Sequence, residues 1–310
     1  MPARRSSSPF PSFKLKILPF PKSMGKPRIT TWEDLHLDCV FIIFSKLGLD
    51  DRTAAIPFVC KSWFQASSHP SLHKILDFTL LDLNSSSPLS KFLSSQFSLH
   101  RFTFSGFLKL AMSLSNGAAD ELRFSALFPP SIEVLSAASA ACPSLKTLFL
   151  PRINFDDEAR FLDLIPRWRD LECLEMESKP SNLGEMVKQI GASCCKFRGL
   201  KIRGSISKED AQGIVNFLPN IESLDLSGSR IRREEALAIV DGCMELKRFT
   251  VRDCVGFEVD DELQRRAAGI ELFEFEGCRA EEKFRNFINH TEDLDYMLMH
   301  YGDCFELWML

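Results

Sequence analysis

The chain has 310 residues, of which 45% are hydrophobic and 26% are charged, and its formal net charge is −4 at pH 7. This length suits a small domain joined to a longer one, and the negative balance gives no general attraction to nucleic acid. No apolar run reaches the roughly 20 residues that a membrane-spanning helix needs. We therefore expect a soluble protein that binds neither membranes nor nucleic acid.

Residues 1–30 are rich in serine and proline and carry seven basic residues but no acidic one: Arg4, Arg5, Lys14, Lys16, Lys22, Lys26 and Arg28. Such a composition is typical of a transit peptide or of a nuclear-import signal. Four prolines interrupt any amphipathic helix in this segment, namely Pro9, Pro11, Pro19 and Pro21. This favours a disordered basic tail, or a start placed too far upstream, over a targeting signal.

Residues 35–47 have apolar residues three or four positions apart, which predicts an amphipathic helix. These residues are Leu35, Cys39, Val40, Ile43, Phe44 and Leu47. Gly48 closes this predicted helix. Asp50 or Asp51 can cap a second helix, because a short carboxylate accepts hydrogen bonds from the free amides of a first turn.

Pro57 predicts an interruption in the second helix, because proline lacks an amide donor and clashes one turn back. We expect a break near Ile56 and a third helix with Pro57 in its first turn. Three short helices bury little apolar surface by themselves, so part of that surface is expected to face a partner.

Two motifs in this region, in this order and spacing, resemble the F-box family. The opening motif is carried by Leu35, His36, Asp38, Ile43 and Phe44, and the second by the run Val59, Cys60, Lys61, Ser62 and Trp63, before a closing Pro70, Ser71 and Leu72. Two positions depart from the family pattern: His36 replaces a preferred proline, and His73 replaces a common tryptophan. An ordinary three-helix core explains the periodicity equally well, but not the ordered motifs.

The resemblance implies docking onto the Skp-type adaptor of an SCF ubiquitin ligase and, through it, onto a cullin scaffold. Residue by residue, the match assigns seven side chains either to adaptor contact or to the small core behind it: Leu35, Val40, Ile43, Phe44, Leu47, Val59 and Trp63. The sequence does not separate these two roles.

A second pattern fills most of the remaining chain. The template L-x-x-L-x-L recurs as Leu145/Leu148/Leu150, Leu171/Leu174/Met176, Phe197/Leu200/Ile202, Ile221/Leu224/Leu226, Leu246/Phe249/Val251 and Ile270/Phe273/Phe275. Successive copies start 24 to 26 residues apart, within the roughly 20 to 29 residues of leucine-rich repeats. Two earlier segments are equally compatible with degenerate copies and with other structure: Leu99/Phe102/Phe104 and Leu122/Leu127.

Each repeat reads as a short strand followed by a helix. In the repeat that starts at Ile221, the strand exits through Ser227 and Gly228, and an amphipathic segment with Ala236 and Ile239 returns. A unit of this size cannot bury its own apolar face, so the repeats must stack into a curved solenoid. Cysteines recur at matching places, at Cys142, Cys243, Cys254 and Cys278, which is similar to plant F-box/LRR-repeat proteins.

The predicted fold is therefore α/β: a short all-helical F-box followed by a leucine-rich-repeat solenoid, with parallel strands on its concave side and helices on its convex side. The predicted organisation is a tail at 1–30, an F-box at 31–77, a packed junction at 78–98, repeats at 99–278 and a cap at 279–310. Trp168, just before a strand, is expected to be buried on the convex side, or else to be an exposed anchor.

Ten cysteines without a signal peptide suggest a reducing compartment, cytoplasmic or nuclear, in which cysteine behaves as a small buried hydrophobe. There is no C-x-x-C pair and the six histidines are scattered, which argues against zinc. Cys304 near His300 is the single candidate nucleophile, and a place in the C-terminal cap is the simpler interpretation. We expect no catalytic residue, no metal and no cofactor.

Residues between the apolar strand positions face away from the core. They form one predicted row with Phe149, Glu175, Lys201, Asp225, Thr250 and Glu274, and a next row with Pro151, Glu177, Arg203, Ser227, Arg252 and Glu276. Their charges largely alternate from strand to strand. One interpretation is a solvated ladder of ion pairs, each worth about 0–1 kcal/mol.

The other interpretation is a surface that recognises a protein substrate by charge complementarity. Its candidate residues are Phe149, Glu175, Glu177, Lys201, Arg203, Asp225, Arg252, Glu274 and Glu276. Either interpretation opposes an anion-binding groove of the kind found in larger hormone-sensing relatives. Two hypotheses on function follow: a substrate receptor of an SCF ligase, or a leucine-rich-repeat interaction protein whose F-box-like segment packs only against its own solenoid.

Overall fold

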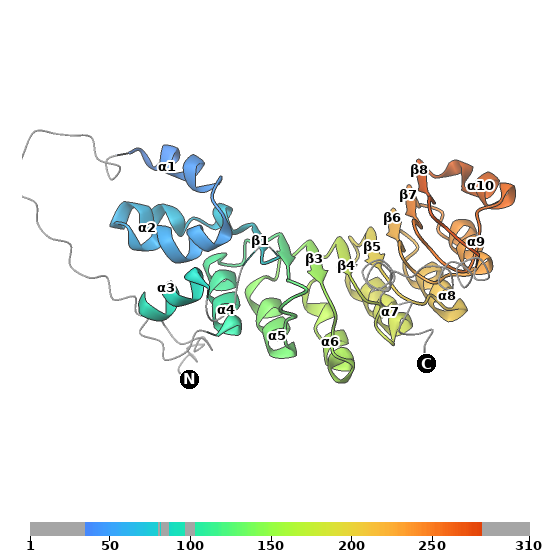
Figure 1. The fold of residues 1–310 in the computed structure, drawn as a ribbon, viewed down its shortest axis with the longest axis horizontal. Coiled ribbons are helices and arrows are strands. Elements are labelled where there is room, and N and C mark those ends of the chain that lie inside the picture. Colours follow the sequence, from blue (N-terminus) through green and yellow to red (C-terminus); the bar gives the residue numbers. More distant parts are fainter. Residues whose placement is uncertain (1–34, 80, 82–86, 97–102, 281–310) are drawn as a thin grey trace, which may run out of the picture.

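The computed structural model describes residues 35–79, 81, 87–96 and 103–280, so the predicted basic tail and all but the first two residues of the predicted cap, with Cys304, lie outside the described residues. The described chain is an elongated α/β body (Figure 1). Helices gather at its N-terminal end, and a curved sheet with helices along one side follows.

The sheet of the described chain has eight parallel strands in sequence order, β1(Ile75–Asp77), β2(Glu121–Arg123), β3(Thr147–Leu150), β4(Cys173–Met176), β5(Gly199–Ile202), β6(Ser223–Asp225), β7(Arg248–Thr250) and β8(Leu272–Glu274). One apolar residue of each strand lies in register with the next, in the row Leu76, Leu122, Leu148, Leu174, Leu200, Leu224, Phe249 and Phe273. From Leu148 onward this row is the middle position of the predicted template. The solenoid predicted from the repeat spacing is confirmed.

Helices return along the convex side: α4(Phe104–Leu114), α5(Ile132–Ala141), α6(Glu158–Leu162), α7(Leu183–Ser193), α8(Lys208–Phe217), α9(Arg233–Gly242) and α10(Asp261–Arg266), with short 3-10 turns at Phe155–Asp157, Ile165–Arg167 and Ala267–Gly269. Their apolar faces and the inward strand residues form one continuous core. Trp168 is fully buried in this core beside Phe161, so it is not an exposed anchor.

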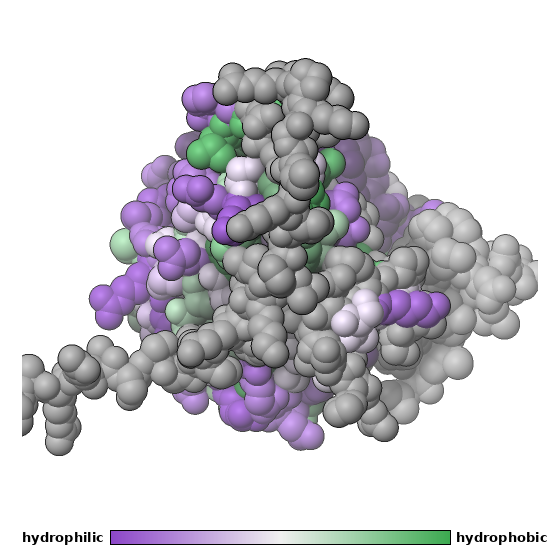
Figure 2. Space-filling view, turned by 90° about the vertical axis from the view of Figure 1, so that its left-hand side faces the viewer, coloured by the Kyte–Doolittle hydropathy of each residue, from purple (hydrophilic) through white to green (hydrophobic). Residues whose placement is uncertain are grey.

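The F-box region comprises α1(Leu37–Phe44), a π-helical turn η2(Asp51–Ala55), a 3-10 turn η3(Ile56–Phe58), α2(Lys61–Ser67) and a 3-10 turn η4(Pro70–His73). It has its own small core of Val40, Phe44, Ile56, Ala66 and Leu72. Figure 2 views this end of the molecule and shows hydrophobic surface in its upper part, where α1 lies in Figure 1.

The interruption at Pro57 differs from the prediction in one respect. Helical structure changes type at Ile56, as expected, but Pro57 belongs to the short turn η3 and not to the next helix. Cys60 is extended, so α2 begins only at Lys61. Because Pro57 lacks an amide donor, the chain turns tightly around it and restarts four residues later.

The first strand lies inside the segment predicted to be F-box. Ile75–Asp77 pairs with Glu121–Arg123, so the sheet begins two residues before the predicted boundary at 77. Of the two degenerate copies, Leu122 lies in a strand, whereas Phe104 starts α4 and Leu99 and Phe102 lie outside the described residues. The three-residue strand β1 has a single fully buried position, Leu76, too little to show a period.

The F-box and the solenoid share a core. Leu49 and Ala54 of the F-box belong to the same apolar cluster as Leu76 and Phe107 of the first repeat. The turn η2 contacts both α3(Pro88–Gln96) and α4. The described parts of the two units therefore form one packed body.

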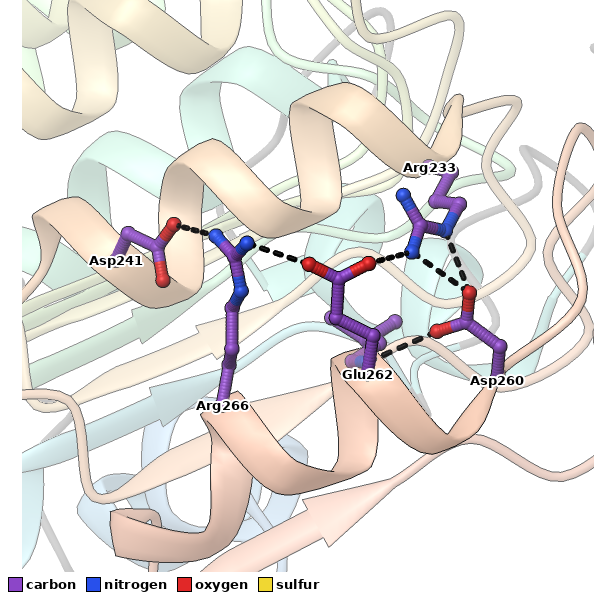
Figure 3. A network of polar contacts seen from close by, with 6 residues as sticks. Arg233, Asp241, Asp260, Glu262 and Arg266 are labelled. Atoms are coloured by element: carbon purple, nitrogen blue, oxygen red, sulfur yellow. Dashed lines mark hydrogen bonds and ion pairs between the residues drawn. The ribbon is translucent and has the colours of Figure 1, made fainter.

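At the other end of the described chain, ion pairs join α9 and α10 (Figure 3). Arg233 of α9 contacts Asp260, at 2.7 Å, and Glu262 beside it, while Arg266 of α10 reaches back to Asp241 and Glu262. The Leu263 amide and the Arg233 guanidinium both lower the pKa of Asp260. These partly exposed pairs are individually weak, and as a network they fix the six-residue helix α10 against α9.

Four cysteines of the described solenoid, Cys142, Cys194, Cys243 and Cys254, are buried in the core, whereas Cys195 is exposed. Burial raises the pKa of four thiols to about 11, namely Cys142, Cys173, Cys194 and Cys243. The Cys194 thiol donates to the Trp168 carbonyl oxygen at 3.3 Å in the preceding repeat. Cys194 thus links two neighbouring repeats, and all four thiols with a raised pKa stay protonated at neutral pH.

No helix of the described ranges is long and apolar enough to cross a membrane.

His73 occupies the position where the F-box pattern commonly has tryptophan, and it is fully buried. Its Nε2 lies 2.8 Å from the Ser67 carbonyl oxygen, and the neighbouring Arg52 donates to the Leu72 carbonyl oxygen. Burial is the main cause that lowers the pKa of His73, the Arg52 charge lowers it further, and the bond to Ser67 opposes both.

We predict that the thermal unfolding midpoint falls as the pH is lowered from about 7.5 to 5.5. The pKa of His73 in the folded chain lies below the usual 6.5. As the pH falls below 6.5, His73 is therefore protonated in the unfolded chain before it is protonated in the folded chain. The free energy of unfolding decreases until the pH reaches the pKa of His73 in the folded chain. His73→Phe should show a flatter pH dependence by scanning calorimetry, even if its midpoint at pH 7.5 is lower. An unchanged dependence in His73→Phe contradicts the assignment.

We also predict selective alkylation of the neighbouring thiols Cys194 and Cys195. Cys195 is exposed, whereas Cys194 is buried and its pKa is raised to about 11. At pH 8 a thiol of that pKa is about 0.1% thiolate. Iodoacetamide followed by mass spectrometry should label Cys195 within minutes and Cys194 only after denaturant is added. Equal labelling of both in the folded chain is the opposing result.

Candidate functional site

The seven residues assigned by the F-box match divide into two groups. Val40 and Phe44 are each 1% exposed and lie in the small core, where the Phe44 ring meets Trp63 edge to face at 5.1 Å. Leu35, Leu47 and Trp63 are half-buried and pack against the same core. Of the two roles that the sequence left open, the structure places Val40 and Phe44 in the core.

The other two of the seven, Ile43 and Val59, are 41% and 46% exposed. Two further apolar side chains of α1 are exposed, Leu37 at 42% and Ile42 at 61%. We refer to the exposed apolar residues Leu37, Ile42, Ile43 and Val59 together as the F-box apolar surface. The three on α1 point to more than one side of the helix, because successive positions lie about 100° apart.

The sequence analysis missed Leu37 and Ile42, although the sequence contains a signal for them. The α1 segment LDCVFIIF has apolar residues around most of the helix, and a helix with a single buried face needs them on one side only.

The departure from family pattern at His36 has a local explanation. His36 is the N-cap of α1, and its ring Nδ1 accepts a hydrogen bond from the Asp38 amide at 3.4 Å. A side-chain acceptor at this position satisfies one of the free amides of the first turn. His36 thus starts the helix by a different means from the proline that the family prefers.

On the concave side, the register aligns the predicted outward row and extends it by two members, Asp77 and Arg123. Phe149, Glu175, Lys201, Asp225, Thr250 and Glu274 follow in order on adjacent strands. In the next row, Pro151 is buried and does not face outward, contrary to the prediction. The remaining members of that row are at least partly exposed.

Several of these charges pair laterally. Lys201 lies 3.7 Å from Asp225, and Arg252 contacts Glu274 at 2.6 Å and Glu276 at 3.3 Å. The Arg203 Nε donates to the Gly228 carbonyl oxygen of the next repeat at 3.3 Å. The ion-pair interpretation therefore applies to the part of the face that runs from β5 to β8.

A hollow of about 470 Å³ opens on the same face and brings together five of the nine predicted substrate-face residues. It is lined by Phe149, Glu175, Met176, Glu177, Lys201, Ile202, Arg203 and Ser227. Asp225, Arg252, Glu274 and Glu276 are not part of its lining. Its floor includes the buried Met176 and Ile202, so it combines an apolar base with charged walls.

Within the described ranges, no group of three or more histidine, cysteine or carboxylate side chains is placed to hold a metal ion. The described residues offer two candidate contact surfaces: exposed apolar residues on the F-box and a charged, hollowed surface on the repeats.

Comparison with known proteins adds independent support. No family model matches the chain. The F-box/LRR-repeat protein At3g48880 of Arabidopsis thaliana is 31% identical over 231 residues, which cover 72% of this chain and 72% of that protein. From the same plant, F-box protein FBW2 is 26% identical over 74% of this chain and 70% of its own length, and F-box protein SKIP19 is 23% identical over 79% and 77%. With the ordered F-box helices and the eight-stranded parallel solenoid, this similarity places the chain in the F-box/LRR-repeat family.

Proposed function

We propose that this F-box protein is the substrate receptor of an SCF-type ubiquitin ligase, with the F-box bound to a Skp-type adaptor and the repeats bound to a protein substrate. The observation that supports this most is the F-box apolar surface. Leu37, Ile42, Ile43 and Val59 are all more than 40% exposed in a domain whose own core is already filled. Burying one such aliphatic side chain contributes about 1.5–3 kcal/mol, so a partner that covers several gains a substantial affinity.

The solenoid supplies the second half of the proposal. Its concave face carries alternating charges and a hollow, which suit a protein ligand better than a phosphate, since acidic and basic groups interleave along the whole face. The shared core between the F-box and the first repeat holds the two surfaces in a fixed relation. Under this proposal the chain contributes proximity, by presenting a substrate lysine to a conjugating enzyme held elsewhere in the complex.

The alternative, a scaffold whose F-box packs only against its own solenoid, predicts that α1 is covered by the chain itself. In the described residues, η2 and η4 contact α4, whereas α1 leaves Ile42 61% exposed. This arrangement favours an external partner for α1.

The test is capture of the full chain by a purified Skp-type adaptor. Ile43→Asp with Val59→Asp should reduce capture by at least about tenfold, because each substitution places an unpaired charge in an apolar contact. The matched control is Leu127→Asp with Met244→Asp, two apolar residues that are 81% and 84% exposed on the repeats. The control pair should bind the adaptor like the wild type.

Circular dichroism of each variant separates lost binding from lost folding. If the folded Ile43→Asp/Val59→Asp variant binds the adaptor as the control does, the surface is wrongly assigned. If the folded wild-type chain binds no Skp-type adaptor, the scaffold hypothesis replaces the proposal.

A further inference from the structure

Two carboxylates of the concave face differ from the other charges there. Glu175 in β4 and Glu177 just after it are two residues apart, so they project to the same side of the sheet. Among the described residues no basic group lies within 4 Å of either carboxylate, whereas Lys201 contacts Asp225. Both glutamates line the hollow. The hollow therefore has an acidic wall whose charge is not neutralised by a direct ion pair.

An aromatic ring lies beside this acidic wall. Phe149 of β3 is directly opposite Glu175 in the strand register, is half-buried and lines the same hollow. A cation over an aromatic ring gains about 0.5–1 kcal/mol at an exposed site and more when water is excluded. Carboxylates next to an aromatic ring form the environment that a guanidinium or ammonium group prefers.

A second depression shares one lining residue, Met176, with the hollow. This depression has a volume of about 220 Å³ and includes Arg152, Ile153, Phe155 and Lys179. Phe155 is 76% exposed at its edge. An exposed aromatic side chain next to a charged pocket is a typical anchor of protein interfaces.

We propose that the hollow and the depression together receive one segment of the protein substrate, which places a lysine or arginine side chain between Phe149, Glu175 and Glu177 and an apolar side chain against Phe155. This inference rests on the proposed function, because it assigns the chemistry of the substrate to the repeat surface. Lys201, the register partner of Glu175, and Arg203 also line the hollow. Lys201 pairs with Asp225, and the Arg203 Nε donates to the Gly228 carbonyl oxygen. Glu175 and Glu177 are thus lining charges without a direct ion-pair partner among the described residues, and they favour a basic segment over an acidic one.

The test uses the full chain, immobilised without any adaptor, as bait for phage that display random 12-residue peptides. We expect the selected peptides to share a lysine or arginine close to an apolar residue. A selected peptide, measured by fluorescence polarisation, should bind Glu175→Gln/Glu177→Gln at least about tenfold more weakly, and Phe155→Ala about fivefold more weakly.

The matched control is Glu245→Gln/Glu271→Gln, which removes the same charge from two exposed positions outside the hollow. It should change the affinity by less than about twofold. Enrichment of acidic peptides, enrichment of no common pattern, or equal binding by the two double variants would overturn the inference.

Adaptor capture by the same preparations separates the two proposals. A wild-type chain that binds the adaptor but selects no basic peptide refutes the substrate chemistry and leaves the ligase role standing. A chain that selects basic peptides but binds no adaptor refutes the ligase role alone.

Discussion

One apolar residue from each repeat, held in register beneath the sheet, is the constraint on which the described solenoid depends. The strands are three or four residues long, so none is stable alone, and the row from Leu76 to Phe273 must stack without a gap. Once that row is fixed, the alternation of side chains along a strand fixes which residues face outward. The ion pairs, the hollow and the unpaired glutamates on the concave face all follow from this register.

The solenoid could be predicted where a copy of the L-x-x-L-x-L template has an apolar residue at all three of its positions, as at Leu145, Leu148 and Leu150. It could not be predicted at Ile75–Asp77, because that strand has one fully buried residue and directly follows the closing F-box motif. For Phe104 the sequence left a degenerate repeat and other structure equally open, and the residue begins the amphipathic helix α4. Both cases occur where the F-box and the repeats meet, because there the tertiary packing overrides a short local pattern.

The candidate sites could be predicted as residue sets but not as surfaces. The F-box match placed Ile43 and Phe44 together, yet successive helix positions point about 100° apart, and only Ile43 reaches the surface. On the repeats, the spacing placed Lys201 between Glu175 and Asp225 and did not say which of the two acids pairs with it. Among the described residues, the Lys201 amine forms its ion pair with Asp225 and not with Glu175. Which residues pair or are exposed depends on side-chain conformation and local burial, which the spacing of residues in the sequence does not give.

The shared core at Leu49, Ala54 and Leu76 has a consequence for how variants of this protein are interpreted. Under the proposed function, that core sets the angle between the bound adaptor and the bound substrate. A larger side chain at Ala54, which is 2% exposed, would leave the F-box apolar surface and the concave face unchanged. To make room for it, the F-box would have to tilt relative to the solenoid. Such a variant would bind both partners with normal affinity and still fail to present the substrate lysine. Loss of ubiquitination would then result from a changed orientation of the bound substrate and not from weaker binding.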